Sequence, residues 1–543
     1  MSTSFSQNVA ASSGAAQRSA ISREFLWLCA AFALLKLAIH VVGNILAQHA
    51  GYGIFRDEMY YLICGRHLAF GYVDQPPLTA IQARLTDILF GYDHMWSLRL
   101  FSAMAGAAKV FLTGLIVHAL GGKRLAAALA MLGVTVVGVY LGIDSYLSMN
   151  SFEPVFWMTC TLCLIHLARV EDGMPGAERI VRNAWIVLGI SAGLGLENKD
   201  NILFFLVAAL AAVLLTRQRR ILWSRWFAVS IGIIVALALP NLLWQIHYHF
   251  PTLEWLIDVS KSDKDVKLPP LQFLLGQIMM LTPWTIPLWL GSVFWLLFAK
   301  MARPFRFLGL MYLVFLPMMM ALHAKDYYLA PIYPLYFAAG AIRWMTWAER
   351  ATWRKALVGL YALLLVVGFV LTVPFSIPVL APQQFLAWSK TMRFQPKDSE
   401  NHPTTTLPAF YADRFGWHEM VDQVGAIYDA LPPSERAVTG IFTGNYGEAS
   451  AINLLGAKYG LPVAISGHQN YWIWGPHGYT GQEMILISYD LTPEKLAQSY
   501  ASCTVAGRVD NPLSMPWERD PIYLCRGRKS TYAADWNDLK FYH

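Results

Sequence analysis

Two adjacent carboxylates, Asp57 and Glu58, stand near the start of a polar and aromatic stretch at residues 55–78. The stretch reads FRDEMYYLICGRHLAFGYVDQPPL and contains a third carboxylate, Asp74, shortly before a Pro-Pro pair. A carboxylate within reach of a hydroxyl or an amine can accept its proton as the group attacks, which is general base catalysis. Each of the three can also cap a helix, but one residue of the adjacent pair would suffice as a cap. The adjacent pair is therefore the stronger candidate for chemistry.

The composition indicates that these residues belong to a membrane protein. The chain of 543 residues is 56% hydrophobic and only 14% charged, whereas a soluble domain has about 25% charged residues. Its 20 Trp and 25 Tyr suit the two membrane–water interfaces, where such amphipathic rings gather. The net charge of +7 is modest and no basic run stands out, which argues against a nucleic-acid partner.

The hydropathy pattern predicts about eleven membrane-spanning helices, since a span needs about 20 mostly apolar residues. The candidate spans are 25–47, 98–119, 125–143, 151–170, 183–197, 201–216, 224–246, 271–299, 305–322, 328–346 and 355–377. Basic residues gather in every second loop, and the positive-inside rule places those loops in the cytoplasm. The N-terminus is therefore expected inside, and residues from about 378 onward are expected outside.

The chain is expected to have three parts. Residues 1–24 form a disordered cytoplasmic N-terminus, residues 25–377 a membrane domain with a first outer loop at 48–97, and residues 378–543 an outer domain. In the last part, strand-like runs such as EMILISY alternate with helical patterns such as GEASAINLLGAKYG, which predicts a small α/β domain. Cys503 and Cys525 lie near the ends of predicted strands there, and they can pair in an oxidising compartment or stay free.

The first outer loop is expected to form two amphipathic helices at the membrane surface. One begins at Asp57 and Glu58, and the other follows Asp74 and the Pro-Pro pair, because Pro is favoured in the first turn of a helix. Each helix would carry a carboxylate at its N-terminal end. The stretch would then be charged because it faces outward and apolar because it lies on the membrane.

The order of these motifs resembles the GT-C type of membrane glycosyltransferase, in particular the bacterial protein-mannosyltransferase-like and aminoarabinose-transferase-like enzymes of families 39 and 83. The Asp-Glu pair and DQPPL carry the likeness first, followed by MNSFEPVFW, GLGLENKDNILFF, KDYYLAPIYPL and SGHQNYWIWGP. The resemblance implies an α-helical polytopic protein in the bacterial cytoplasmic membrane, with a periplasmic α/β domain at the C-terminus.

The resemblance also implies a reaction. A sugar would move from a polyprenyl phosphate, such as undecaprenyl phosphate, to lipid A, a protein or an envelope glycan outside the membrane. Attack opposite the phosphate would invert the anomeric centre in one step, so no nucleophilic carboxylate is needed. The resemblance assigns the base to Asp57, with Glu58 in support.

The leaving group in such a reaction is a phosphate, so cations must meet its developing negative charge. The resemblance assigns this contact to Lys325 together with Tyr327 or Tyr328, in the segment KDYYLAP. Lys199 is a further candidate, although its loop can also be an ordinary connection. The other cations expected to face outward are Arg56, Arg66 and Arg99.

One position departs from the family pattern. Aminoarabinose transferases have a Lys directly before the Pro-Pro pair for phosphate binding, and this chain has Gln75 there. A Gln side chain can hydrogen-bond a phosphate but cannot neutralise it. The departure weakens the case for aminoarabinose as the transferred sugar.

The same relatives can hold a metal ion between the acidic residue two positions before Pro-Pro and a later His. The matching residues are Asp74 and either His247 or His249, in the segment WQIHYHF. One carboxylate with one His is a sparse ligand set, and a His beside Trp and Tyr also suits the membrane interface. The sequence requires no cofactor and leaves a divalent metal ion open.

Glu153 stands at the outer start of a predicted span, beside Asn150. A carboxylate in mid-span costs about 2.5–3.5 kcal/mol, so one near the end of a span is expected to meet water or to serve a function. It can help to cap the helix, and we favour a supporting role in the acceptor site.

A second class of function fits a polytopic chain, namely a lipid or sugar transporter or flippase with a glycan-binding outer domain. Transporters carry ionisable or broken segments at mid-membrane in both halves, whereas the polar motifs here lie at the outer ends of predicted spans. The aromatic segment GHQNYWIWGPHGY suits sugar stacking in a binding domain or in an acceptor site. The sequence therefore favours chemistry at the outer face, with membrane lipid, a lipid-linked donor and an acceptor as partners.

Overall fold

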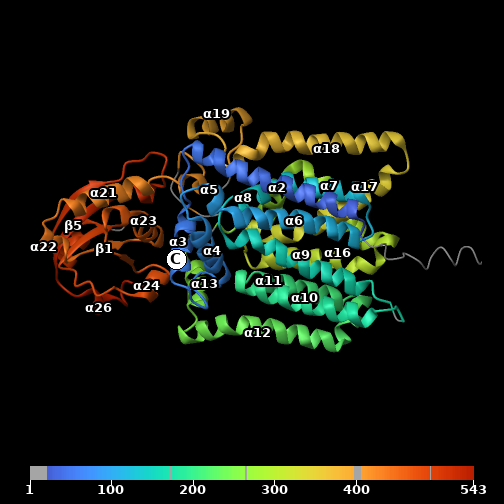
Figure 1. Cartoon of the computed structure of the whole chain (residues 1–543), viewed down its shortest axis with the longest axis horizontal. Helices are drawn as coiled ribbons and strands as arrows, with labels where there is room; N and C mark the ends of the chain where they lie inside the picture. Colours follow the sequence, from blue (N-terminus) through green and yellow to red (C-terminus); the bar gives the residue numbers. More distant parts are fainter. Residues whose placement is uncertain are drawn as a thin grey trace, which may run out of the picture.

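The structure is a computed structural model that describes residues 21–171, 173–262, 266–396, 401, 405–488 and 491–542. The N-terminal segment predicted to be disordered lies, up to residue 20, outside these ranges. A bundle of long helices makes up most of the molecule, and a smaller domain with a β-sheet lies at one end of it (Figure 1). Three short helices lie where the two meet, namely α3 (Arg56–Arg66), α4 (Leu78–Phe90) and α13 (Pro251–Lys261).

Each predicted span coincides with helical structure. The helices are α2 (Arg23–His49), α6 (Leu100–Ala119), α7 (Arg124–Val136) with α8 (Gly138–Ile143), α9 (Met149–Ala168), α10 (Ala177–Asn198), α11 (Ile202–Leu214), α12 (Arg225–His247), α14 (Pro270–Met280) with α15 (Ile286–Phe298), α16 (Arg306–Ala321), α17 (Tyr333–Ala348) and α18 (Thr352–Thr372). In the described part of the chain, seven helical segments are long and apolar enough to cross a membrane. The number rises to nine if each of two pairs of helices joined at a sharp bend is counted as one span. A polytopic helical fold is confirmed, and the number of eleven spans stays a prediction.

The segment predicted as one span at 271–299 is broken in the middle. Its two helical parts are bent by 86°, and Thr282 between them has a φ of 62°, in the left-handed region. Pro283 follows and lacks the N–H that a continuous helix would use. The predicted span at 125–143 is likewise divided, because Val137 between α7 and α8 has an extended backbone.

The described residues of the C-terminal domain form one five-stranded mixed sheet in the order β2-β1-β3-β5-β4. The strand β1 (Thr439–Thr443) pairs in parallel with β2 (Ala464–Ser466) and β3 (Glu483–Ile487), while β5 (Pro521–Arg528) pairs antiparallel with β3 and with β4 (Tyr500–Arg508). The helices of this domain are α21 (Trp417–Asp429), α22 (Pro433–Arg436), α23 (Tyr446–Leu455), α24 (Asn470–Trp474), α25 (Pro493–Ser499) and α26 (Tyr532–Asp535). Cys503 and Cys525 lie opposite each other on β4 and β5 and form a disulfide.

The helix α3 was expected to lie on the membrane surface, but the structure buries it inside the protein. Its residues from Glu58 to Gly65 are all buried, and they share one apolar core with Trp417, Met420 and Ile441 of the C-terminal domain. Only α4 keeps an exposed apolar side, where Leu85, Ile88 and Leu89 are exposed. The apolar residues of α3 therefore hold the two parts of the protein together, and those of α4 suit contact with lipid.

Candidate active site

Asp57 lies in the first turn of α3, where the helix N-terminus favours a negative charge. The hydroxyl of Tyr446, at the start of α23, donates a hydrogen bond of 2.7 Å to Asp57 Oδ1. The Asp57 side chain is 28% exposed, and within the described residues no hydrogen bond reaches its second oxygen, Oδ2. A partly exposed carboxylate with one oxygen held and the other open has the form that a general base needs.

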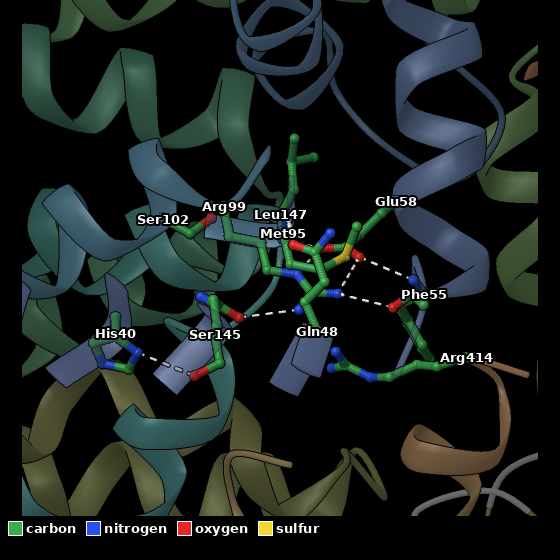
Figure 2. A network of polar contacts seen from close by, with 12 residues as sticks. His40, Gln48, Phe55, Glu58, Met95, Arg99, Ser102, Ser145, Leu147 and Arg414 are labelled. Atoms are coloured by element: carbon green, nitrogen blue, oxygen red, sulfur yellow. Dashed lines mark hydrogen bonds and ion pairs between the residues drawn. The ribbon is translucent and has the colours of Figure 1, made fainter. Parts of the chain in front are cut away.

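Glu58 is next in sequence, but its side chain is completely buried. Arg99 donates from Nε and from Nη2 to its two oxygens, each at 2.8 Å, and the backbone N–H groups of Leu147 and Phe55 donate at 2.8 Å and 2.9 Å. Figure 2 shows this network. Burial alone would raise the pKa of Glu58, but the Arg99 guanidinium and these hydrogen bonds hold it below its usual value.

These four donors use the acceptor capacity of the Glu58 carboxylate, which has about four lone-pair sites. Arg99 precedes α6 and also donates to Asn44 Oδ1 of α2 at 3.0 Å. The pair thus ties α3 to α2, to α6 and to the loop that holds Leu147. Its geometry suits a positioning role for Glu58, which holds α3 and, with it, Asp57.

A cationic cluster forms where the start of α9, the loop after α10 and the 3-10 helix η4 (Asp326–Ile332) meet. Lys199 Nζ donates to Asn150 Oδ1 at 2.8 Å, lies 3.5 Å from Glu153 Oε2, and stands 4.3 Å and 5.4 Å from the ring centres of Tyr328 and Tyr327. The structure therefore brings four predicted site residues together. Lys325, a fifth, lies directly before η4.

Glu153 completes this cluster from within α9. Its second oxygen, Oε1, accepts a hydrogen bond of 2.8 Å from Asn201 Nδ2, so both carboxylate oxygens have partners. The carboxylate balances the charge of Lys199 and fixes its position. This arrangement places Glu153 beside Lys199, and its supporting role in the acceptor site stays a prediction.

Tyr146 connects the carboxylate and the cationic cluster. Its ring packs edge-on against Phe55, at 5.6 Å between ring centres, and its hydroxyl accepts a hydrogen bond of 3.3 Å from Asn150, which also contacts Lys199. Burial raises the pKa of Tyr146, the charge of Asp57 raises it further, and the charge of Lys199 lowers it. Both charges therefore act on this one phenol, which shares Asn150 with Lys199.

Asp74 and Gln75 lie in the loop before α4. Asp74 Oδ1 accepts a hydrogen bond of 3.1 Å from Tyr60, and α4 begins at Leu78 with Pro77 as its N-cap, so Asp74 does not cap the helix. Gln75 is only 1% exposed, and its amide has no hydrogen-bond partner among the described residues. Gln75 thus lies inside the loop rather than on an open surface that a phosphate can reach.

Three further predicted residues are Arg66, His247 and His249. Arg66 is at the opposite end of α3, about 14 Å along the helix axis at about 1.5 Å per residue, and it pairs with Asp87 at 3.0 Å. His247 and His249 are exposed at the end of α12. Within the described residues, no three His, Cys, Asp or Glu side chains form a group that suits a metal ion. Asp74 and the two histidines therefore form no group of three ligands, and the pairing of Asp74 with one His stays a prediction.

The aromatic segment at 466–476 packs inside the protein. Trp474 stacks on His67 at 4.7 Å between ring centres, and the indole N–H of Trp472 donates to the Trp536 carbonyl. Asn470 Oδ1 accepts from the backbone N–H of Val73 at 2.7 Å. These contacts dock the C-terminal domain on the loop that contains Asp74, so the segment builds the site rather than offering a free surface for sugar stacking.

The sequence reasoning missed a fully buried group of charges inside the bundle. Lys109 Nζ lies 2.8 Å from Asp144 Oδ1, and Lys36 Nζ lies 3.4 Å from Asp144 Oδ2, with all three side chains 0% exposed. The sequence suggested that the polar residues lie at the outer ends of the spans. These buried charges show that polar residues also lie inside the bundle. A signal was present, because Lys36, His40 and Asn44 follow one another at four-residue intervals along a single helix face.

Both the sequence and the fold of this chain are similar to those of known glycosyltransferases. Residues 74–244 match the sequence model of the family described as dolichyl-phosphate-mannose-protein mannosyltransferase. The undecaprenyl phosphate-alpha-4-amino-4-deoxy-L-arabinose arabinosyl transferase 1 of Pseudomonas fluorescens is 27% identical over 40% of this chain and 38% of its own length. The lipid A galacturonosyltransferase RgtD of Rhizobium johnstonii is 24% identical over 38% of this chain and 41% of its own. The matched parts thus span about two fifths of these relatives.

Solved structures cover far more of the chain. ArnT from Cupriavidus metallidurans bound to undecaprenyl phosphate has a TM-score of 0.57 at 15% identity, over 91% of this chain and 97% of that one. The Archaeoglobus fulgidus oligosaccharyltransferase tethered to an acceptor peptide has a TM-score of 0.51 at 12% identity, over 81% of this chain and 64% of that one. The predicted resemblance is confirmed, and the chain has the GT-C glycosyltransferase fold found in ArnT.

Proposed function

We propose that this protein is an inverting glycosyltransferase of the bacterial cytoplasmic membrane. It transfers a sugar from a polyprenyl phosphate, with undecaprenyl phosphate as the lipid, to an acceptor at the outer face. The acceptor classes are lipid A, protein and envelope glycan. The observation that carries the proposal is the partly exposed Asp57, with one oxygen held by Tyr446, together with Lys199, which shares its partner Asn150 with Tyr146. The likeness to an arabinosyl transferase and to a lipid A galacturonosyltransferase supports the donor and the reaction class.

The reaction follows from the chemistry of the acceptor, which meets Asp57, and of the donor phosphate, which leaves. Asp57 Oδ2 accepts the proton of the acceptor hydroxyl or amine while that group attacks the anomeric carbon. The bond between this carbon and the phosphate oxygen breaks on the opposite face, and its electron pair leaves with the phosphate. One displacement therefore inverts the anomeric centre, with no covalent sugar on the protein.

The protein groups around the reacting atoms have separate tasks. The Tyr446 hydrogen bond fixes Asp57 Oδ1 and leaves Oδ2 for the acceptor. Lys199 and Lys325 meet the negative charge that grows on the leaving phosphate, and Tyr327 and Tyr328 line the same position. We assign no step to a metal ion.

The orientation belongs to the same proposal. The N-terminus lies in the cytoplasm and the C-terminal domain in the periplasm, because the basic loops mark the cytoplasmic side. Asp57 then lies at the periplasmic surface, where a lipid-linked donor and an envelope acceptor meet.

A transporter or flippase is the second candidate, and the buried group of Lys36, Lys109 and Asp144 favours it, since ionisable residues inside a membrane bundle often mark a transport path. The three groups satisfy one another, however, and Lys36 also donates to the carbonyls of Thr135 and Tyr140 at the break between α7 and α8. This geometry stabilises a broken span, so we retain the transferase.

The experiment compares transfer with transport. The purified full chain in lipid nanodiscs is given polyprenyl phosphate sugars with lipid A, a Ser/Thr peptide or an envelope glycan, and the product linkage is read by mass spectrometry and NMR. The transferase predicts a linked product of inverted anomeric configuration with release of polyprenyl phosphate. Movement of the donor across vesicles with no linked product under any pairing would support the transporter instead.

A further inference from the structure

A cavity of about 570 Å³ lies at the end of the bundle away from the C-terminal domain. Its walls come from the starts of α2, α7 and α18 and from the ends of α6 and α17, all of which belong to the helical part in Figure 1. It is therefore separate from the site around Asp57. Nothing in the proposed reaction uses it.

The cavity is positively charged. Lys123, Arg124 and Lys355 line it, and Glu349 is the one carboxylate among its lining residues. Lys123 Nζ lies 2.8 Å from Glu349, with side chains 81% and 51% exposed, and Arg124 Nη2 lies 2.7 Å from Glu24 of α2, with side chains 54% and 68% exposed. Such exposed pairs contribute little. Lys355 has no hydrogen bond or ion pair within 4 Å in the described residues. A doubly or singly charged phosphate can therefore compete for these cations.

The start of α7 adds to the attraction for an anion. Residues 122–126 line the cavity, and they include the first turn of this helix of 13 residues. No side chain hydrogen-bonds to these first backbone N–H groups as a cap. Free N–H groups at a helix N-terminus favour an anionic oxygen, and here the residues that carry them line the same cavity as the three cations.

The surroundings of the cavity indicate where the anion comes from. Trp27 on α2, Leu125 on α7 and Trp353 on α18 are 73%, 67% and 58% exposed, which gives the neighbouring helix surfaces an apolar character suited to acyl chains. Trp is favoured at the membrane interface, and basic pockets between membrane helices bind anionic lipid headgroups. The chain's own first 20 residues contain no Asp or Glu, so they cannot supply the anion.

We propose that this cavity binds the phosphate-containing headgroup of an anionic phospholipid of the surrounding bilayer. Lys123, Arg124 and Lys355 neutralise the headgroup, and the exposed apolar residues beside the cavity contact its acyl chains. With the proposed orientation, the lipid belongs to the cytoplasmic leaflet, on the side opposite to sugar transfer.

The test uses the full chain purified in detergent and measures retained lipid by native mass spectrometry and the thermal midpoint of unfolding. Phosphatidylglycerol, phosphatidylethanolamine and inorganic phosphate are added separately to the wild type, to K123Q/K355Q and to K300Q/R303Q. The last variant is the matched control, because Lys300 and Arg303 are exposed and lie outside the cavity.

We expect phosphatidylglycerol to bind the wild type and the control alike, and K123Q/K355Q about tenfold more weakly. Phosphatidylethanolamine should bind weakly to all three, and inorganic phosphate should not raise the midpoint as the lipid does. An equal loss of phosphatidylglycerol binding in K123Q/K355Q and K300Q/R303Q would overturn the proposal, and so would equal binding of phosphatidylglycerol and phosphatidylethanolamine by the wild type. A rise of the thermal midpoint with inorganic phosphate alone would also overturn it and would assign the site to a free anion. If K123Q/K355Q unfolds early without lipid, the single variant K355Q decides, since Lys355 has no ion pair to lose.

Discussion

Removing the positive charge of Arg99 should destabilise the protein strongly, because Glu58 would stay buried without a partner. The variant R99M keeps an unbranched side chain of similar length in the space between α3 and α6 but loses both 2.8 Å donors to the carboxylate. Breaking a fully buried ion pair from one side costs about 3–5 kcal/mol. The two backbone N–H donors remain, so we expect a loss near the lower end of this range.

The double variant R99M/E58Q separates the charge from the packing. The side-chain amide that E58Q introduces is neutral, and its oxygen can still accept the two backbone hydrogen bonds, so the double variant should recover about half or more of the loss. Chemical unfolding of the detergent-solubilised chain, followed by near-UV circular dichroism, gives the two free energies. A double variant no more stable than R99M would refute the claim that the unpaired charge of Glu58 is the main cost.

The same pair makes a prediction about pH. The folded pKa of Glu58 lies below its unfolded value, because Arg99, the more distant Arg414 and the Leu147 hydrogen bond together outweigh burial. Its contribution to stability is therefore complete above the unfolded pKa and is lost as the pH falls through the folded one. The stability of R99M/E58Q should depend less on pH in the acidic range than that of the wild type.

Three further predictions concern other parts of the site and the outer domain. K199Q should lower the transfer rate about 10²–10³-fold, since the cation acts on the leaving phosphate; a normal rate would move that role to Lys325 alone. Y446F should lower the rate several-fold, because Asp57 loses the hydrogen bond that holds Oδ1; Y459F, in which the lost hydroxyl is the one that contacts Asp422, is the control. Burial and repulsion from Glu448 raise the pKa of Glu518, so the folded state binds the extra proton and stability falls as the pH rises above the unfolded value of about 4.5. E518Q should flatten that fall, measured by thermal unfolding between pH 5 and pH 8, whereas the exposed control E494Q should not.

The fold was largely predictable from the sequence because local patterns determine it. Apolar runs fall where helices form, and strand-like runs such as EMILISY and PIYLCRG coincide with β3 and β5. The breaks at Val137 and Thr282 were not predicted, because hydropathy records how apolar a segment is and not whether its backbone bends. The same limit leaves the number of spans open.

The site was only partly predictable because its contacts join distant residues. Asp57 meets Tyr446 across 389 positions of sequence, and Glu58 meets Arg99 across 41. The adjacent pair Asp57 and Glu58 looked like one functional unit, but successive residues on a helix point in different directions, by about 100° per residue. One side chain therefore faces the site, and the other faces the interior.

The grouping of Lys199, Glu153, Tyr327 and Tyr328 had a basis in the motifs, since each lies in a polar segment at an end of a predicted span. The burial of Gln75 had no such basis in the sequence, because nothing in DQPPL shows that the loop folds the Gln75 amide inward. The sequence identified most of the residues around the cation and could not decide which of them are open to a substrate.

The central claim is that Asp57 is the general base, and D57N tests it most directly. The measurement is the single-turnover rate of sugar transfer from a polyprenyl phosphate donor by the purified full chain, with D93N, an exposed carboxylate in the same outer loop, as the control. The account predicts a rate about 10²–10⁴-fold below that of the wild type for D57N, unchanged binding of the donor lipid, and a normal rate for D93N. Transfer by D57N at the rate of the wild type would contradict it.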